Sequence, residues 1–299
     1  MLASMKDLAG KVAVITGAAS GIGLAMAHRF AAEKMTLVLL DIEQPALARA
    51  EDALRSAGAT VLAIRTDVTQ ATDLEAAAAQ AHAAFGNLHV ICNNAGVGGS
   101  AGPMWTLSDA DWEWTLSVNL WGVIRGIRVF LAPLLASGEE GHIVNTASMA
   151  GLTSVPFMGP YTAAKHAVVA ISEVLAKELE LTSAKVGVSV LCPGFVKTQI
   201  ASSERNRPAD LRSGRGPTGD ASSDAGPRLA HAIHDLVAAG QSPEAIADQV
   251  VSAIRASRFY VLTHPEMKPA IEHRLRDILE ERAPGIDPMS RGLAARPPS

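Results

Sequence analysis

The stretch VAVITGAASGIG at residues 12–23 decides the fold. Its apolar start, Val12–Ile15, predicts a buried strand, and an Ala-rich run from Gly21 predicts a helix over 21–34. Between them, Gly17, Gly21 and Gly23 permit a tight turn that lets a ligand approach the backbone closely. Because N–H groups at a helix N-terminus bind phosphate, this strand–turn–helix predicts a dinucleotide site. The alternative is a tight turn without a ligand.

The same alternation of short apolar runs and longer helical stretches continues along the chain. We expect strands at 12–16, 36–40, 60–65, 88–92, 142–147, 187–191 and 259–262. We expect helices at 21–34, 45–57, 71–85, 108–136, 160–181, 242–257 and 265–282. This order is typical of a doubly wound parallel sheet with helices on both faces. The sequence therefore predicts the α/β class, with a single Rossmann-type domain over 1–299.

One long insertion interrupts this pattern near the C-terminal end. Residues 199–228 are rich in Ser, Arg, Asp, Gly and Pro, and an apolar helical stretch follows at 229–237. Such a segment inside a domain is usually a linker, an insertion or an active-site lid. We expect a substrate lid inserted at 195–240, and a flexible tail at 284–299.

Four lid arginines have acidic residues nearby in the sequence, which favours a solvated charged face. These are Arg205, Arg207, Arg212 and Arg215.

Composition excludes several classes of protein. The formal net charge is −4, so the chain lacks the basic footprint of a nucleic-acid-binding protein. The two cysteines, Cys92 and Cys192, lie in apolar runs and suit buried thiols rather than a disulfide framework or a metal site. We see no apolar run near the roughly 20 residues that span a bilayer. The sequence therefore predicts a cytoplasmic protein without a metal, a nucleic-acid partner or a membrane segment.

An acidic residue at the end of the second strand indicates which cofactor binds. Asp41 is placed to accept hydrogen bonds from the adenosine ribose and to repel a 2′-phosphate. Neither Ile42 nor Ser20 supplies a cation to offset this, so NAD is favoured over NADP. A simple turn aspartate is the alternative. Asp67 and Val68 follow the third strand and could bracket the adenine ring, although Asp67 also fits a helix cap.

The fourth strand ends in Asn93-Asn94-Ala95-Gly96. The paired amides can join neighbouring strands, and the small residues let a cofactor ribose approach. These two roles are compatible.

Three side chains suit proton transfer. Tyr161 and Lys165 are four residues apart and share a helix face. A nearby ammonium favours the phenolate and lowers the tyrosine pKa from its usual value of about 10, so Tyr161 can act as an acid/base near neutral pH. Ser148, at the end of the fifth strand, can hydrogen-bond a substrate oxygen. Taken alone, the Tyr–Lys spacing would more often mark a solvated helix face.

Together these motifs closely resemble the short-chain dehydrogenase/reductase family, over about residues 8–198. The matching elements are TGAASGIG at 16–23, Asp41, Asp67, NNAG at 93–96, Asn119, Ser148, YTAAK at 161–165, Pro193-Gly194 and Thr198. One position departs from the family pattern, because His89 stands where the family usually carries Asp. We interpret His89 as a structural adjustment.

The resemblance implies specific roles. Tyr161 would be the general acid/base, and Ser148 would orient and polarise the substrate oxygen. Lys165 would bind the nicotinamide ribose and lower the pKa of Tyr161, while Asn119 would anchor a water in the proton relay. The implied NAD-binding residues are Gly17, Ser20, Gly21, Ile22, Gly23, Asp41, Asp67, Val68, Asn94, Ala95, Gly96, Tyr161, Lys165, Pro193, Gly194, Val196 and Thr198.

The resemblance implies NAD-dependent interconversion of a secondary alcohol and a ketone. Loops 97–105 and 149–158 carry no Arg or Lys, which favours a neutral small-molecule substrate. The lid and His264-Pro265-Glu266 look like a bacterial subgroup that oxidises bulky aryl or lignin-derived alcohols. Two alternatives stay open: an NAD(H)-binding regulatory protein without turnover, and an NAD-using epimerase or dehydratase.

The family usually pairs helices corresponding to 108–136 and 160–181 across a dimer axis. The resemblance therefore implies a homodimer or homotetramer.

Overall fold

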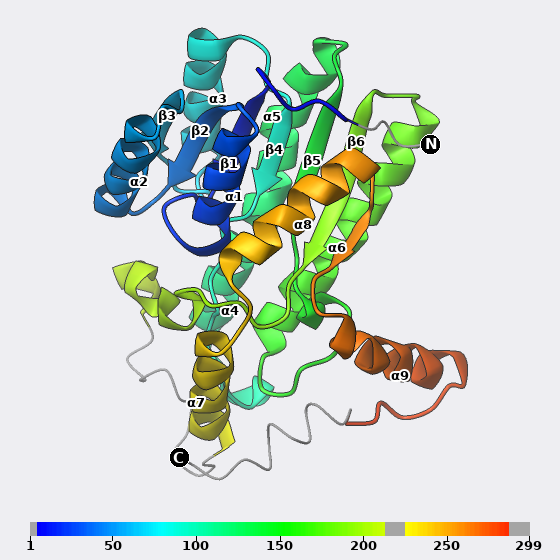
Figure 1. The fold of residues 1–299 in the computed structure, drawn as a ribbon. Coiled ribbons are helices and arrows are strands. Elements are labelled where there is room, and N and C mark those ends of the chain that lie inside the picture. Colours follow the sequence, from blue (N-terminus) through cyan, green and yellow to red (C-terminus); the bar gives the residue numbers. More distant parts are fainter. Residues whose placement is uncertain (1–4, 213–224, 287–299) are drawn as a thin grey trace.

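The computed structural model describes residues 5–212 and 225–286, except for the side chains of 225–230. Its centre is a seven-stranded parallel sheet in the order β3-β2-β1-β4-β5-β6-β7 (Figure 1). The strands are β1 Val12–Thr16, β2 Thr36–Asp41, β3 Val61–Arg65, β4 Val90–Asn93, β5 Gly141–Thr146, β6 Val186–Cys192 and β7 Tyr260–Leu262. The strand order reverses between β1 and β4, which opens a crevice at the carboxyl ends of these strands.

Helices cover both faces of the sheet, as predicted (Figure 1). They are α1 Gly21–Ala32, α2 Gln44–Ser56, α3 Ala71–Phe85, α4 Asp109–Leu116, α5 Gly122–Ala136, α6 Gly159–Leu181, α7 Ala225–Ala238, α8 Pro243–Ala256 and α9 Lys268–Leu279. One apolar layer joins the sheet to α1, α2 and α8, and the other joins it to α3, α5 and α6. The predicted doubly wound α/β fold is confirmed.

The helix expected at 108–136 is interrupted. Ser108 caps α4 in a reciprocal pair with Asp111, but α4 ends at Leu116. A π-helical segment, Ser117–Trp121, then leads into α5. The sequence did not predict this break, because its residues are as apolar as their neighbours.

The stretch Asp109–Ala136 bears on the expectation that no segment could span a bilayer. Within the described part of the chain, it is long and apolar enough to do so by length and composition, with a mean hydropathy of 1.4. Here α5 packs against α3 and β4. Composition alone therefore does not exclude a membrane segment.

Within the predicted lid, the described residues form short helical pieces. A 3-10 segment covers Ile200–Asn206, another covers Ala209–Leu211, and α7 follows the residues that are not described. A bridge between Val196 and Gln241 joins the two ends of the insertion. Arg215 and tail residues 287–299 lie outside the described residues, and the described tail residues 284–286 are exposed.

His89 has the structural role that its sequence position suggested. Its Nδ1 accepts from the Val12 backbone N–H at 3.0 Å, and its Nε2 lies 2.8 Å from Glu139 Oε2. Lys11 and Asn87 contact the same carboxylate. The side chain therefore ties β1 to the start of β5, away from the carboxyl ends of the strands.

Candidate active site

A cavity of about 310 Å³ lies at the carboxyl edge of the sheet, where the strand order reverses. Its lining includes all but two of the residues predicted for the site, Gly23 and Asn119. The predicted residues on the cavity wall are Gly17, Ser20, Gly21, Ile22, Asp41, Asp67, Val68, Asn94, Ala95, Gly96, Ser148, Tyr161, Lys165, Pro193, Gly194, Val196 and Thr198. The fold thus brings residues from both halves of the sheet to one site.

The turn after β1 requires glycine at two positions. Gly17 has φ +66°, and a Cβ there would lie 2.8 Å from Ala95 Cα. Gly23 does not line the cavity, but a Cβ there would lie 2.0 Å from the Gly17 carbonyl oxygen. Ser20 precedes α1 without a side-chain capping bond and lines the cavity. The N-terminus of α1 is therefore open to an anionic ligand, as phosphate binding requires.

Asp41 connects this turn to the end of β2. Its carboxylate accepts from the Ala19 backbone N–H at 2.9 Å and from the Glu43 backbone N–H at 2.9 Å. Burial raises the pKa of Asp41, and these two hydrogen bonds partly oppose the rise. Asp41 therefore has a structural function in addition to its place on the cavity wall.

Asp67 does not cap the next helix, because the N-cap of α3 is Gln70. Its Oδ1 instead accepts from the Thr69 backbone N–H at 2.9 Å and from the Thr69 hydroxyl at 2.7 Å, which closes a local turn before that helix. Asp67 and Val68 also line the cavity. Their proposed contact with adenine thus remains a prediction that the geometry permits.

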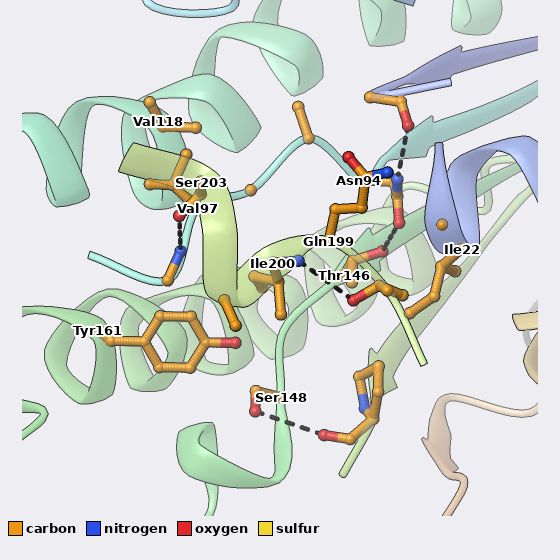
Figure 2. A pocket seen from close by; sticks show the side chains of 18 of the residues that line it. Ile22, Asn94, Val97, Val118, Thr146, Ser148, Tyr161, Gln199, Ile200 and Ser203 are labelled. Atoms are coloured by element: carbon orange, nitrogen blue, oxygen red, sulfur yellow. Dashed lines mark hydrogen bonds between the residues drawn. The ribbon is translucent and has the colours of Figure 1, made fainter. Parts of the chain in front are cut away.

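The amides after β4 join neighbouring strands, as the sequence suggested. Asn93 Nδ2 donates to Asn145 Oδ1 at 2.9 Å, which links β4 to β5. Asn94 Nδ2 donates to the Thr16 carbonyl at 3.1 Å. Thr146 Oγ1 donates to Asn94 Oδ1 at 3.2 Å (Figure 2). These contacts fix the spacing of the strands below the cavity.

Tyr161 and Ser148 point into the same cavity from different elements. Tyr161 lies in the first turn of α6, and its hydroxyl faces the space beside Ile200 and Ser148 (Figure 2). Ser148 Oγ lies 3.3 Å from the Pro193 carbonyl and accepts from the Ala150 N–H at 3.1 Å. A carbonyl or hydroxyl oxygen placed between the two hydroxyls could bond to both.

Lys165 lies one helical turn beyond Tyr161 and is buried. Its Nζ donates to the Thr146 carbonyl at 2.9 Å and lies 5.6 Å from the centre of the Tyr161 ring. Burial lowers the pKa of Lys165 to about 8. Burial raises the pKa of Tyr161, and the hydrogen bond with Ser148 partly opposes this rise. The pKa of Tyr161 is therefore raised overall, whereas the nearby lysine alone was expected to lower it.

Asn119 does not reach the cavity with its side chain. Its Oδ1 accepts from the Val97 N–H at 2.8 Å, and its Nδ2 donates to the Val97 carbonyl at 2.8 Å. Both polar groups are therefore used to hold the loop after β4 against the π-helical segment. A water in the proton relay would have to be held by the main chain here, rather than by this amide.

The structure corrects the expectation that the lid arginines form a solvated charged face. The Arg207 side chain is only 4% exposed, and its Nη2 lies 2.8 Å from Asp111 Oδ1. Arg205 Nη2 lies 2.6 Å from Glu43 Oε1, at the end of β2. We call residues 200–212 the strap, because these pairs attach it to both sides of the cavity. Arg207 and Asp111 are 96 positions apart, so the sequence contained no local signal for this pair.

Comparisons with known proteins agree with this geometry. Residues 11–209 match the family model described as short chain dehydrogenase. The chain is 35% identical to a CLA biosynthesis dehydrogenase/reductase of Lactiplantibacillus plantarum, over 94% of this chain and 98% of that protein. It is 32% identical to a C alpha-dehydrogenase of a Sphingobium species, over 94% of this chain and 89% of that protein.

A solved structure shows the same likeness. The crystal structure of a short chain dehydrogenase/reductase from Burkholderia phymatum, in complex with NAD, aligns with a TM-score of 0.91 and 44% identity. The alignment covers 95% of this chain and 99% of that one.

Proposed function

The chain belongs to the short-chain dehydrogenase/reductase family, and on that premise we propose that it is an NAD-dependent oxidoreductase. It interconverts a secondary alcohol and a ketone, with Tyr161 as the general acid/base. This proposal rests on one observation: the hydroxyls of Tyr161 and Ser148 face the same cavity, and the Lys165 ammonium lies nearby. A protein that only sensed NAD(H) would have no need for such a set.

The cavity residues suit NAD. The open N-terminus of α1, which begins beside Gly17, would hold the diphosphate, and Asp41 would accept from the adenosine ribose. Lys165 would bind the nicotinamide ribose, with Gly194 and Thr198 against the same end of the cofactor. When bound, NAD supplies the acceptor for the carbinol hydrogen and its two electrons.

The chain's own residues hold the substrate oxygen and move its proton. In the oxidation, the Tyr161 phenolate takes the proton of the alcohol hydroxyl, and the C–H bond at the carbinol carbon breaks. In the reduction, the phenol returns that proton to the ketone oxygen. Ser148 holds the oxygen in both directions, and the Lys165 ammonium stabilises the phenolate by its charge.

The cavity wall near Tyr161 favours a neutral, apolar substrate that can be bulky or aryl. The apolar lining of the cavity includes Val97, Trp114, Val118, Met149, Val155, Met158, Phe195, Ile200, Ile233 and Met267. The acidic lining residues are Asp41, which ends β2, and Glu43 and Asp67, which follow β2 and β3; all three lie on the opposite half of the sheet from Ser148. Because an unpaired charge is costly to bury among apolar side chains, anionic alcohols should be poor substrates.

A substrate panel tests this proposal. Aliphatic, aryl and steroidal secondary alcohols are incubated with NAD, each beside a carboxylate-bearing analogue, and NADH is followed by absorbance. We expect NADH to accumulate with neutral apolar alcohols and much less with their anionic analogues. Accumulation only with anionic alcohols would contradict the substrate class. Conversion without NADH accumulation would indicate an epimerase or dehydratase instead.

We also propose a homodimer or homotetramer in the cytoplasm. Large apolar side chains are exposed on α5 and α6 and beside them, notably Trp121, Leu135, Val174 and Leu181. These helices correspond to those expected to pair across a dimer axis. Both cysteines are buried free thiols, which suits a reducing compartment.

A further inference from the structure

His264 holds the turn Pro193–Phe195 at the cavity from the side of β7. It follows β7 by two residues and is only 5% exposed. The Gly194 backbone N–H donates to His264 Nδ1 at 3.0 Å, and His264 Nε2 lies 3.0 Å from the Phe195 carbonyl. Because the N–H can only donate and the carbonyl can only accept, Nδ1 accepts and Nε2 donates, and the Thr263 hydroxyl also lies 2.7 Å from Nδ1.

The ring also fits closely against the backbone of the turn. A Cβ at Gly194 would lie 2.7 Å from His264 Cγ and 2.6 Å from Met267 Sδ. Gly194 is therefore held by both a hydrogen bond and direct packing. The C-terminal part of the chain, which begins with β7 at the edge of the sheet (Figure 1), thus determines where this turn lies.

The turn connects His264 to the proposed catalytic hydroxyl. The Pro193 carbonyl lies 3.3 Å from Ser148 Oγ and accepts from the Met149 N–H at 2.8 Å. Pro193 and Gly194 share one peptide bond, which is planar and rigid. A shift of the Gly194 N–H would therefore move the carbonyl that Ser148 contacts.

The bonds of the ring to Gly194 and to Phe195 are not equivalent. The Phe195 carbonyl also accepts from the Gln241 N–H at 3.0 Å, so it keeps a partner without the histidine. Within the described residues, His264 Nδ1 is the one acceptor found for the Gly194 N–H. Loss of Nδ1 would leave the partly buried Gly194 N–H unsatisfied, which costs up to about 1–3 kcal/mol unless the turn moves.

We propose that His264 is a positioning residue for the alcohol–ketone reaction. Through Nδ1 it fixes Gly194, and through the Pro193 peptide it fixes Ser148 and the wall on which the nicotinamide end of the cofactor lies. This inference rests on the proposed function. The residue lies outside the span 11–209 that the family model matches, and it is not among the site residues predicted from the sequence.

Two conservative variants separate the two ring nitrogens. In His264→Asn, the amide oxygen takes the place of Nδ1 and still accepts from Gly194. In His264→Gln, the amide nitrogen takes the place of Nε2 and still donates to Phe195. We expect His264→Gln to raise the Kd for NADH and to lower kcat/KM, each by roughly tenfold to hundredfold, because small misplacements in a site have large effects. We expect His264→Asn to keep both quantities much closer to those of the wild type than His264→Gln does.

The matched control is another buried histidine. His142, in β5, is fully buried and bonded to Ser189 Oγ at 2.8 Å, and its variant His142→Asn should lower Tm without changing the Kd for NADH. The Kd is measured by NADH fluorescence and needs no substrate, so it tests His264 even if no alcohol is oxidised.

Three outcomes would overturn the proposal. The first is that His264→Gln behaves as well as His264→Asn, since glutamine is closer to histidine in volume. The second is an unchanged Kd and kcat/KM in both variants. The third is a failure of both variants to fold while His142→Asn folds, which would assign His264 to stability alone.

Discussion

Asp41 shows how one carboxylate can serve both the fold and the choice of cofactor. Its two oxygens accept from the Ala19 and Glu43 backbone N–H groups, so the glycine turn and the end of β2 are held together by the same group. A negative charge in this place also repels a 2′-phosphate. We propose that the carboxylate favours NAD by repulsion of the competing cofactor, in addition to any contact with the ribose.

We predict that Asp41→Ser will relax the preference for NAD over NADP. Removal of one charge near a phosphate should change the ratio of kcat/KM values by about tenfold to hundredfold. The ratio is measured from initial rates with the two cofactors. Asp67→Asn is the matched control, because its carboxylate lines the same cavity but follows β3. A wild-type preference for NADP would show that Asp41 does not select NAD in the way proposed.

Residues with local signals could be predicted from the sequence, and those with distant partners could not. Asp41 and Ser148 stand at strand ends, and Tyr161 and Lys165 share a helix face, so local patterns in the sequence identify each of them. His264 acts on a turn 70 positions away, and only the folded sheet places it there. The pKa of Tyr161 was misjudged because charge proximity was visible in the sequence while burial was not.

At the scale of elements, the strap is attached by one buried ion pair and one exposed pair. Arg207 and Asp111 are almost fully buried, and Ser100 and Ser108 donate to the same Asp111 carboxylate. These hydrogen bonds, together with the arginine, hold the pKa of Asp111 down to about 2 despite its burial. Arg207 also lies over the ring of Trp114, at 5.1 Å from its centre, and so supports the apolar cavity wall.

We predict that Arg207→Leu will lower the free energy of unfolding by about 3–5 kcal/mol, because it leaves the Asp111 charge buried without its cation. Urea denaturation measures this loss. Arg205→Leu is the matched control in the same segment, since its pair with Glu43 is partly exposed and should contribute less than about 1 kcal/mol. Equal losses in the two variants would contradict the assigned role of the buried pair.

The strands were predictable to within one or two residues because each is a short apolar run between turn residues. The break in 108–136 was not, because no Pro or Gly marks residues 117–121. The π-helical segment contains Asn119, whose amide pairs with the Val97 backbone. A contact between distant segments therefore accompanies this irregularity, and no local pattern predicts it.

Across the whole molecule, the stability depends on pH through the buried side chain of His142. His142 is fully buried in the central sheet, and burial lowers its pKa to about 3. Its Nδ1 has no hydrogen-bond partner among the residues that the structure describes. As the pH falls below 6.5, the ordinary pKa of histidine, the unfolded chain takes up a proton that the folded chain does not.

We therefore predict a loss of stability on acidification that depends on His142. The contribution of neutral His142 to the free energy of unfolding is fully present above pH 6.5, and it is lost as the pH falls toward the folded-state pKa of about 3. By about pH 4 this loss should reach about 3 kcal/mol in the free energy of unfolding. His142→Asn should flatten the dependence, measured by urea denaturation across the pH range, whereas the exposed His28→Asn should keep the wild-type slope. Identical slopes in wild type and His142→Asn would contradict this account.

We propose that Tyr161 transfers the substrate proton, and Tyr161→Phe is the variant that tests this role. Tyr161→Phe removes the hydroxyl and keeps the ring that packs in α6. We expect turnover of the best alcohol from the panel to fall by at least about a hundredfold, since general acid–base catalysis contributes at least that much. The Kd for NADH, measured by fluorescence, should stay close to that of the wild type. Turnover that persists at the wild-type rate would contradict the account.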